Sequence, residues 1–192
     1  MIPAIFFWIF IVVAIIGSFT YGTWRLSLVR RIFKNLALKR NGAAYGNLNP
    51  SQLTFSYHDR MIVVWAVAGM RHEPAYTRVS VEVNNQKNIY LNIYGESFGY
   101  RVGKRFGAQD IRTGNSDFDD KYIVEGNNES IIRQLLTNFI QEKLIALRED
   151  HATVTLQKNE LIVSMPKVLK IEEKYDVLID TALLLVDRVQ EI

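Results

Sequence analysis

A run of residues without a charged side chain, Met1 to Trp24, opens this 192-residue chain and constrains its fold more than any other feature. As an α-helix the run would be about 36 Å long, which exceeds the roughly 30 Å of a bilayer's hydrocarbon core. It is longer than the apolar region of a cleaved signal peptide, no Lys or Arg precedes it, and no clear small-residue cleavage site follows. The sequence therefore predicts a single, uncleaved transmembrane helix over residues 1–24.

Basic residues follow this run directly. Up to His58 the chain has six Lys or Arg and no Asp or Glu, whereas the remainder has 17 basic and 20 acidic residues. The positive-inside rule then predicts an inner (plasma) membrane protein with its N-terminus outside and its C-terminal part in the cytoplasm. Because the excess of positive over negative charge is confined to this stretch, we expect membrane lipid and not nucleic acid as the partner of the chain. The predicted headgroup contacts are Arg25, Arg30, Arg31, Lys34, Lys39 and Arg40.

The chain divides into three predicted parts. The transmembrane anchor covers residues 1–24, and apolar residues at helical spacing indicate a basic juxtamembrane helix behind it. Residues 41–50 are small, polar and uncharged, which is typical of a linker, so we predict one segment of helix and linker over 25–50. Residues 51–192 are then a soluble domain of ordinary size.

Alternating apolar and polar residues predict three strands early in this domain, and a short apolar run predicts a fourth, buried strand. They lie near residues 53–57, 61–68, 77–83 and 89–93. The short connections between them predict an antiparallel β-meander.

The apolar period changes later in the chain. Helical spacing runs from Ile132 to Leu147, with Asn128 as a predicted N-cap and a break near Thr137. A hairpin over 153–165 and a closing amphipathic helix over 171–189 follow. Strands grouped first and helices later indicate an α+β fold, with the helices and the hairpin packed on the meander.

One motif suggests catalysis. The segment Gly95 to Gly99 matches the G-x-S-x-G nucleophile elbow around Ser97, and Asp117 and His151 follow in the order of a hydrolase triad. That elbow belongs to a parallel α/β sheet, however, and the strands before it are predicted to be antiparallel. A serine hydrolase is therefore the alternative prediction, and a protein without catalytic residues is the main one.

The remaining polar clusters point to binding at most. Arg101, Lys104 and Arg105 form a basic group that could bind an anion, but Arg105 stands where a phosphate-binding P-loop requires Ser or Thr. The chain lacks cysteine and its three histidines are dispersed, so we predict no metal site and no cofactor. Within the anchor, a stripe of small residues indicates helix association: Ala14, Ser18 and Gly22.

A longer segment resembles a known kind of protein. The stretch Phe118 to Asn128, continuing through Leu135-Leu136-Thr137 and preceded by Gln109 to Gly114, resembles uncharacterised prokaryotic membrane-anchored proteins over about residues 107–173. The resemblance implies a cytoplasmic domain beside one or two transmembrane helices, and it implies no catalytic residues. Such proteins often have proline after Leu-Leu-Thr, where this chain has Asn138.

These observations predict a single-pass membrane protein with a cytoplasmic binding or scaffolding domain. An alternative within the same class is an accessory subunit of a larger membrane complex, in contact with another membrane protein or with a second copy of itself. Neither prediction depends on the hydrolase motif.

Overall fold

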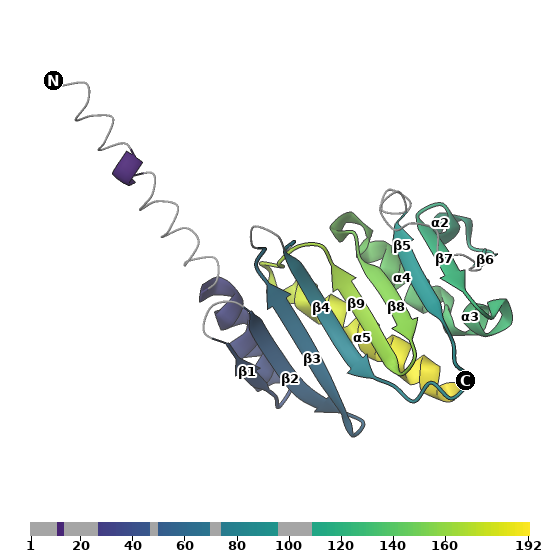
Figure 1. The fold of residues 1–192 in the computed structure, drawn as a ribbon, viewed down its shortest axis with the longest axis horizontal. Coiled ribbons are helices and arrows are strands. Elements are labelled where there is room, and N and C mark those ends of the chain that lie inside the picture. The colour runs from purple at the N-terminus through teal and green to yellow at the C-terminus, as the bar shows by residue number, and fades with distance from the viewer. Residues whose placement is uncertain (1–10, 14–26, 47–49, 70–73, 96–108) are drawn as a thin grey trace.

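The computed structural model describes residues 11–13, 27–46, 50–69, 74–95 and 109–192, and it has one sheet with helices against one face (Figure 1). The sheet has nine strands in the order β1-β2-β3-β4-β9-β8-β5-β7-β6, and every neighbouring pair is antiparallel. The α+β prediction is therefore confirmed. The strands are β1 (Ala43–Tyr45), β2 (Ser51–Tyr57), β3 (Arg60–Val67), β4 (Tyr76–Glu82), β5 (Leu91–Gly95), β6 (Gln109–Asp110), β7 (Tyr122–Gly126), β8 (Thr153–Gln157) and β9 (Glu160–Met165).

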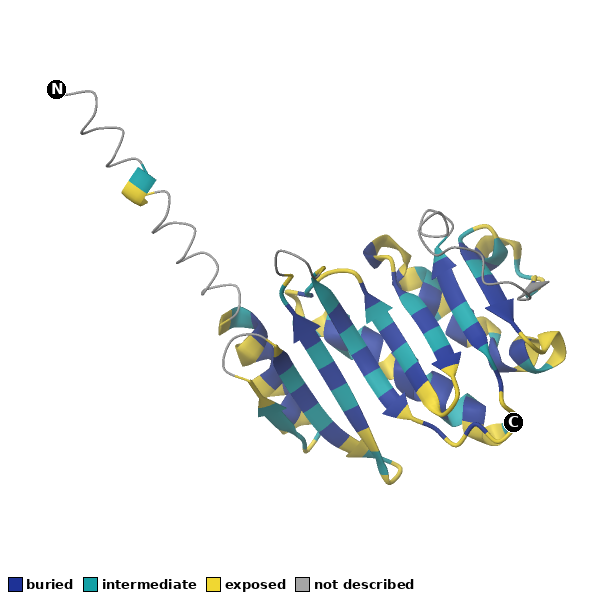
Figure 2. Ribbon diagram, viewed as in Figure 1, coloured by how far each residue is buried: buried dark blue, intermediate teal, exposed yellow. Residues whose placement is uncertain are grey.

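The core lies between the sheet and the helices. Successive side chains of a strand point to opposite faces, and Figure 2 shows the resulting alternation of buried and half-buried residues across the sheet. Leu53, Val64 and Val79 are fully buried on the helix side, as are Val163 of β9 and Val154 of β8. The helices that cover them, besides the helical residues 27–39, are α2 (Ser116–Asp119), α3 (Glu129–Leu135), α4 (Asn138–Ala146) and α5 (Glu172–Glu191), with a 3₁₀ turn, η2, at Arg148–Asp150.

The meander prediction is correct for three strands and wrong for the fourth. β2, β3 and β4 are consecutive neighbours, but β5 pairs with β7 and β8 instead of β4. The β8–β9 hairpin lies between β4 and β5, so its strands complete the hydrogen bonding of both. This order places the last hairpin of the chain at the centre of the sheet.

The helical predictions for the second half agree with the structure. The Asn128 side chain caps α3 by accepting a hydrogen bond from the Ile131 amide at 3.2 Å. Thr137 adopts an extended conformation and separates α3 from α4, so the predicted break is present. α5 buries its apolar face on the sheet, where Tyr175 meets the Phe33 ring edge-on at 5.2 Å between centroids.

Residues 27–46 belong to the folded domain, which corrects the predicted linker for its described part. Residues 27–39 form a helix whose apolar side is buried, with Phe33 and Leu36 among the least exposed residues. Asn41 has a φ of 50°, and the Gly42 amide bonds to the Ala37 carbonyl at 2.8 Å, which ends the helix and turns the chain. β1 then pairs with β2, so residues 41–45 of the predicted linker form a helix cap and an edge strand.

The predicted anchor over residues 1–24 lies outside the described residues except for 11–13. Those three are helical, and Val12 and Val13 are 51% and 62% exposed. None of the helices in the described ranges combines the length and hydropathy that a bilayer crossing requires.

Candidate functional site

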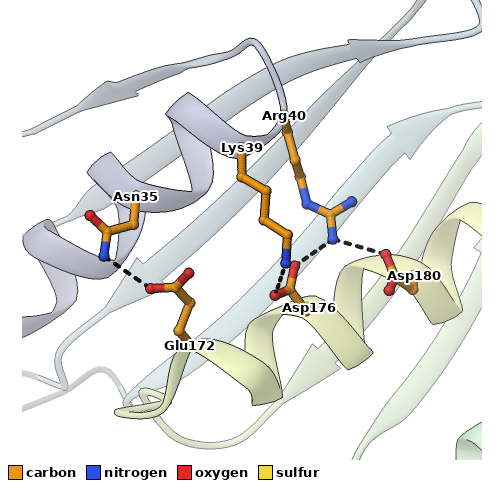
Figure 3. Close-up of polar contacts among 6 residues, drawn as sticks. All are labelled: Asn35, Lys39, Arg40, Glu172, Asp176 and Asp180. Atoms are coloured by element: carbon orange, nitrogen blue, oxygen red, sulfur yellow. Dashed lines mark hydrogen bonds and ion pairs between the residues drawn. The ribbon is translucent and has the colours of Figure 1, made fainter.

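The helix over residues 27–39 is joined to α5 by a row of polar contacts, and both helices lie on the same side of the sheet (Figure 3). The Asn35 amide nitrogen donates to Glu172 at 3.1 Å, and Lys39 donates to Asp176 at 2.6 Å. Arg40, just after the helix, donates to Asp176 at 2.6 Å and to Asp180 at 2.8 Å. The buried apolar side and this polar row together fix the helix to the domain.

Arg40 is the centre of this row. Only 14% of its side chain is exposed, and its guanidinium carbon lies 5.5 Å from the centre of the Phe55 ring. Burial alone would raise the pKa of Asp176, but the hydrogen bonds from Lys39 and Arg40 outweigh burial and hold that pKa below its ordinary value. Of the predicted headgroup contacts, Lys39 and Arg40 are thus paired with carboxylates of the protein itself.

The other basic residues of this helix have no such partners. Arg30, Arg31 and Lys34 are exposed, and none of them has a hydrogen bond or ion pair within the described part of the chain. Arg30 and Lys34 border a cavity of about 140 Å³ between the helix and β1, whose wall also includes Tyr45 and Ser51. The helix therefore carries two kinds of cation: paired ones at its C-terminal end and unpaired ones nearer the N-terminus.

The second surface of interest is the sheet face opposite the helices. Most strands present polar side chains there, but β3 is apolar on both faces. Met61 is 56% exposed, and Val63 and Trp65 are half-buried on the same side. We call these three residues the β3 stripe. An antiparallel sheet with one solvated face ordinarily alternates apolar and polar residues, so the β3 stripe departs from the pattern of its neighbours.

A groove lies at one end of the β3 stripe. It has a volume of about 780 Å³, and its walls come from β3, β4 and the β8–β9 turn. Ser80 donates to Glu160 at 2.6 Å within it, which leaves both side chains satisfied. Its lining combines apolar and charged residues, including Met61, Val63, Ser80, Glu82, Lys158 and Glu160.

A polar network continues along the same face toward β7. Thr155 donates to Asn92 at 3.3 Å, and Tyr94 donates from its hydroxyl to Glu125 at 2.8 Å. Glu125 is only 8% exposed, so this hydrogen bond offsets the cost of burying a carboxylate. The network makes this part of the face polar, in contrast to the β3 stripe.

The described residues do not provide the structural context that the hydrolase alternative requires. Ser97 lies outside the described residues, whereas Asp117 lies in α2 and His151 follows η2. No hydrogen bond or ion pair joins Asp117 to His151 in the described chain. β5, which precedes Ser97, is antiparallel to both neighbours, while a nucleophile elbow stands on a parallel sheet. The described residues contain no group of three or more His, Asp or Glu able to hold a metal ion.

Several predicted site residues lie outside the described ranges. They are the possible anion ligands Arg101, Lys104 and Arg105, the small-residue stripe Ala14, Ser18 and Gly22, and the headgroup contact Arg25.

Sequence reasoning missed the two carboxylates that bind Arg40. Asp176 and Asp180 are one turn apart on α5, and like charges at that spacing destabilise a helix unless a cation lies between them. The spacing of these two aspartates is the sequence signal that could have predicted a bound cation there. For the β3 stripe the signal was the unbroken apolar run of residues 61–68, which predicts a strand with two apolar faces.

Comparison with known proteins gives a likeness of fold. No family model matches the chain, and no curated protein matches it significantly. Among solved structures, the fold is similar to the crystal structure of the mycobacterial trehalose monomycolate transport factor A, TtfA. The TM-score is 0.56, over 83% of this chain and 93% of that chain, at 10% sequence identity. At this identity the similarity concerns the fold alone.

Proposed function

We propose that this chain is a membrane-tethered binding domain that serves as an accessory subunit of a larger membrane complex. In this proposal residues 1–24 cross the inner membrane once, with the N-terminus outside and the sheet domain in the cytoplasm. The β3 stripe and the adjoining groove bind a protein partner. The observation that carries the proposal is the β3 stripe, an apolar row on the sheet face that no described helix covers.

The tether is supported by the distance between the apolar run and the domain. Trp24 ends the run, and helical structure is present from Ser27 onward. Three residues of fully extended chain reach at most about 11 Å. A domain held this closely has little freedom to leave the bilayer surface, and its exposed cations Arg30, Arg31 and Lys34 come within reach of anionic headgroups.

A binding role is supported by the composition of the sheet face. Fully burying a side chain such as Val or Met contributes about 1.5–3 kcal/mol, and this gain is only partly realised at Met61 and Val63. A protein that covers the β3 stripe would complete the burial. Aromatic residues and Met are enriched in protein interfaces, which agrees with Trp65 and Met61 at this place.

The fold comparison offers an analogy for the role. The similar structure is that of a trehalose monomycolate transport factor. By analogy we propose an accessory role in transport for this chain. The analogy concerns the role and carries no substrate from that protein to this one.

Photo-crosslinking in native membranes tests the proposal. A photoreactive amino acid replaces Met61 in the full-length chain, and the matched control carries the same residue at Ala146, which is exposed on the helix side. We expect the protein to remain in the membrane pellet after an alkaline carbonate wash. Illumination should give one discrete protein adduct from position 61 and none from position 146.

Two outcomes would contradict different parts of the proposal. Release of the unmodified chain by the carbonate wash would exclude the tether. Recovery of monomer alone from position 61, or equal adducts from both positions, would exclude the β3 stripe as a specific binding surface.

A further inference from the structure

The cavity between the helix 27–39 and β1 has the chemistry of a phosphate site. Arg30 and Lys34 are four residues apart, so their side chains lie on the same side of the helix. Both border the cavity, together with the aromatic residue Tyr45 and the small residues Gly46 and Ser51. None of the described residues that line it is an Asp or a Glu. Its two charged groups are therefore both cationic.

These two cations are not used by the fold. Within the described chain Arg30 and Lys34 have no hydrogen bond and no ion pair, whereas Lys39 and Arg40 on the same segment are bound to Asp176. A guanidinium presents a planar fork that matches two phosphate oxygens, and an ammonium adds a point charge. The pair thus provides complementary recognition of one phosphate group.

The size of the cavity limits what can occupy it. A volume of about 140 Å³ corresponds to roughly five water molecules of about 30 Å³ each. That space admits a phosphate group and excludes a whole phospholipid. The acyl chains of a bound lipid would have to remain outside, in the bilayer.

The cavity also lies close to the proposed membrane surface. Arg30 is six residues beyond Trp24, and the residues from 27 onward are helical. The extended reach from Trp24 to Ser27 plus one helical turn gives an upper limit of roughly 16 Å between Trp24 and Arg30. The headgroup layer on one side of a bilayer is roughly 5–8 Å thick, so the Arg30 side chain can reach phosphates at its surface.

We infer that this cavity, lined by Arg30 and Lys34, binds the phosphate of an anionic phospholipid headgroup. This inference rests on the proposed membrane tether for the source of the ligand, and on the cavity alone for its chemistry. It makes the two residues a specific site, in contrast to the diffuse attraction expected of any basic segment. Arg31, which does not border the cavity, contributes only the diffuse part.

Native mass spectrometry of the full-length chain in a non-ionic detergent tests the inference. The lipids are phosphatidylglycerol and phosphatidylcholine, and inorganic phosphate is the free competitor. The site variant is Arg30→Gln with Lys34→Gln. The matched control is Arg31→Gln with Lys170→Gln, which removes the same charge from two exposed positions outside the cavity.

We expect phosphatidylglycerol to bind the wild type more tightly than phosphatidylcholine does. The site variant should bind phosphatidylglycerol about 30-fold more weakly, since it removes two charge-assisted contacts to one phosphate, each of which contributes at least about fivefold. The control variant should bind as the wild type does. All four side chains are exposed, so unchanged circular dichroism is expected for both variants.

The outcomes distinguish failure of the phosphate site from failure of the proposed membrane tether. Equal weakening in the two variants, or no weakening in the site variant, would overturn the inference. We also compare wild-type samples with and without millimolar inorganic phosphate. Displacement of phosphatidylglycerol by the added phosphate would support the phosphate chemistry and assign the cavity to free phosphate as well. Loss of the chain from the membrane pellet would contradict the proposed tether and leave the result in detergent standing.

Discussion

Replacing Arg40 by Met should loosen the attachment of the helix 27–39 to α5. Met keeps an unbranched apolar stem against Phe55 but removes the guanidinium that bridges Asp176 and Asp180. The bond to Asp176 joins two largely buried side chains, 14% and 18% exposed, and a charged hydrogen bond of this kind contributes about 1.5 kcal/mol. Asp180 is 55% exposed, so that pair adds about 0.5 kcal/mol.

The expected loss is therefore about 2 kcal/mol in the free energy of unfolding. For a domain of this size, 1 kcal/mol corresponds to about 2–4 °C in Tm, so Arg40→Met should lower Tm by about 4–8 °C. The assay is thermal unfolding of the full-length chain in a non-ionic detergent, followed by circular dichroism. Arg31→Met is the matched control, because Arg31 is an exposed cation of the same helix with no partner in the described chain, and it should change Tm by no more than about 2 °C.

The pH dependence gives a second test of the same reasoning. The pKa of folded Asp176 is held below its ordinary value, so its contribution is fully present above the unfolded pKa of about 3.9. This contribution is lost as the pH falls through the lower, folded pKa. The Tm difference between the wild type and Arg40→Met should thus be large at pH 7 and should shrink as the pH falls below about 3.9 and through the lower, folded pKa of Asp176. Equal Tm values for Arg40→Met and Arg31→Met at pH 7, or a difference that persists in acid, would refute the argument.

Two further predictions concern the topology of the chain and another buried acid, Asp150. Because the chain has no cysteine, single cysteines introduced at Ile2 and Ser56 report its topology. We expect a membrane-impermeant maleimide to label Ile2→Cys in intact cells and Ser56→Cys only after permeabilisation. The reverse pattern would exclude the proposed orientation. Asp150, whose side chain is 6% exposed, accepts from Lys174 at 2.8 Å and pairs with Lys167; burial would raise its pKa, but these bonds lower it. Asp150→Asn should cost about 2 kcal/mol in urea unfolding at pH 7 and progressively less as the pH falls below about 3.9, the ordinary carboxyl pKa. A cost independent of pH would contradict the assigned role.

Local periodicity was sufficient to predict most elements of the fold. The strands β2 to β5, the hairpin, α5 and the break at Thr137 all follow from the spacing of apolar residues and from turn or cap residues within a few positions. Local periodicity does not predict the order of the strands in the sheet. β4 pairs with β9, which is about 80 residues later in the chain, and no local pattern encodes that choice.

The attachment of the N-terminal helix was missed for the same reason. Its buried residues Phe33 and Leu36 recur at helical spacing among basic residues, and such an apolar stripe fits a headgroup layer as well as a protein core. What distinguishes the two is the partner surface on α5, where Asp176 is 136 residues away from Arg40. The Asn-Gly pair after the helix was likewise read as a linker, although it serves as a helix cap.

The candidate surfaces were predictable only in part. The sequence predicts Arg30 and Lys34 as headgroup contacts but does not predict the cavity they share, because β1 supplies its other wall. The β3 stripe was visible as an apolar run and was assigned wholly to the core. Deciding that one of its faces is uncovered requires knowing that all described helices lie on the other side.

The two outermost strands of the described sheet are short: β1 has three residues and β6 has two. A free strand edge is a template on which other chains assemble, and a brief edge offers few main-chain groups for such growth. The domain is therefore expected to have little tendency to polymerise into fibrils, even at the high local density that the proposed tether would allow. A partner is expected to recognise it through side chains rather than by extending its sheet.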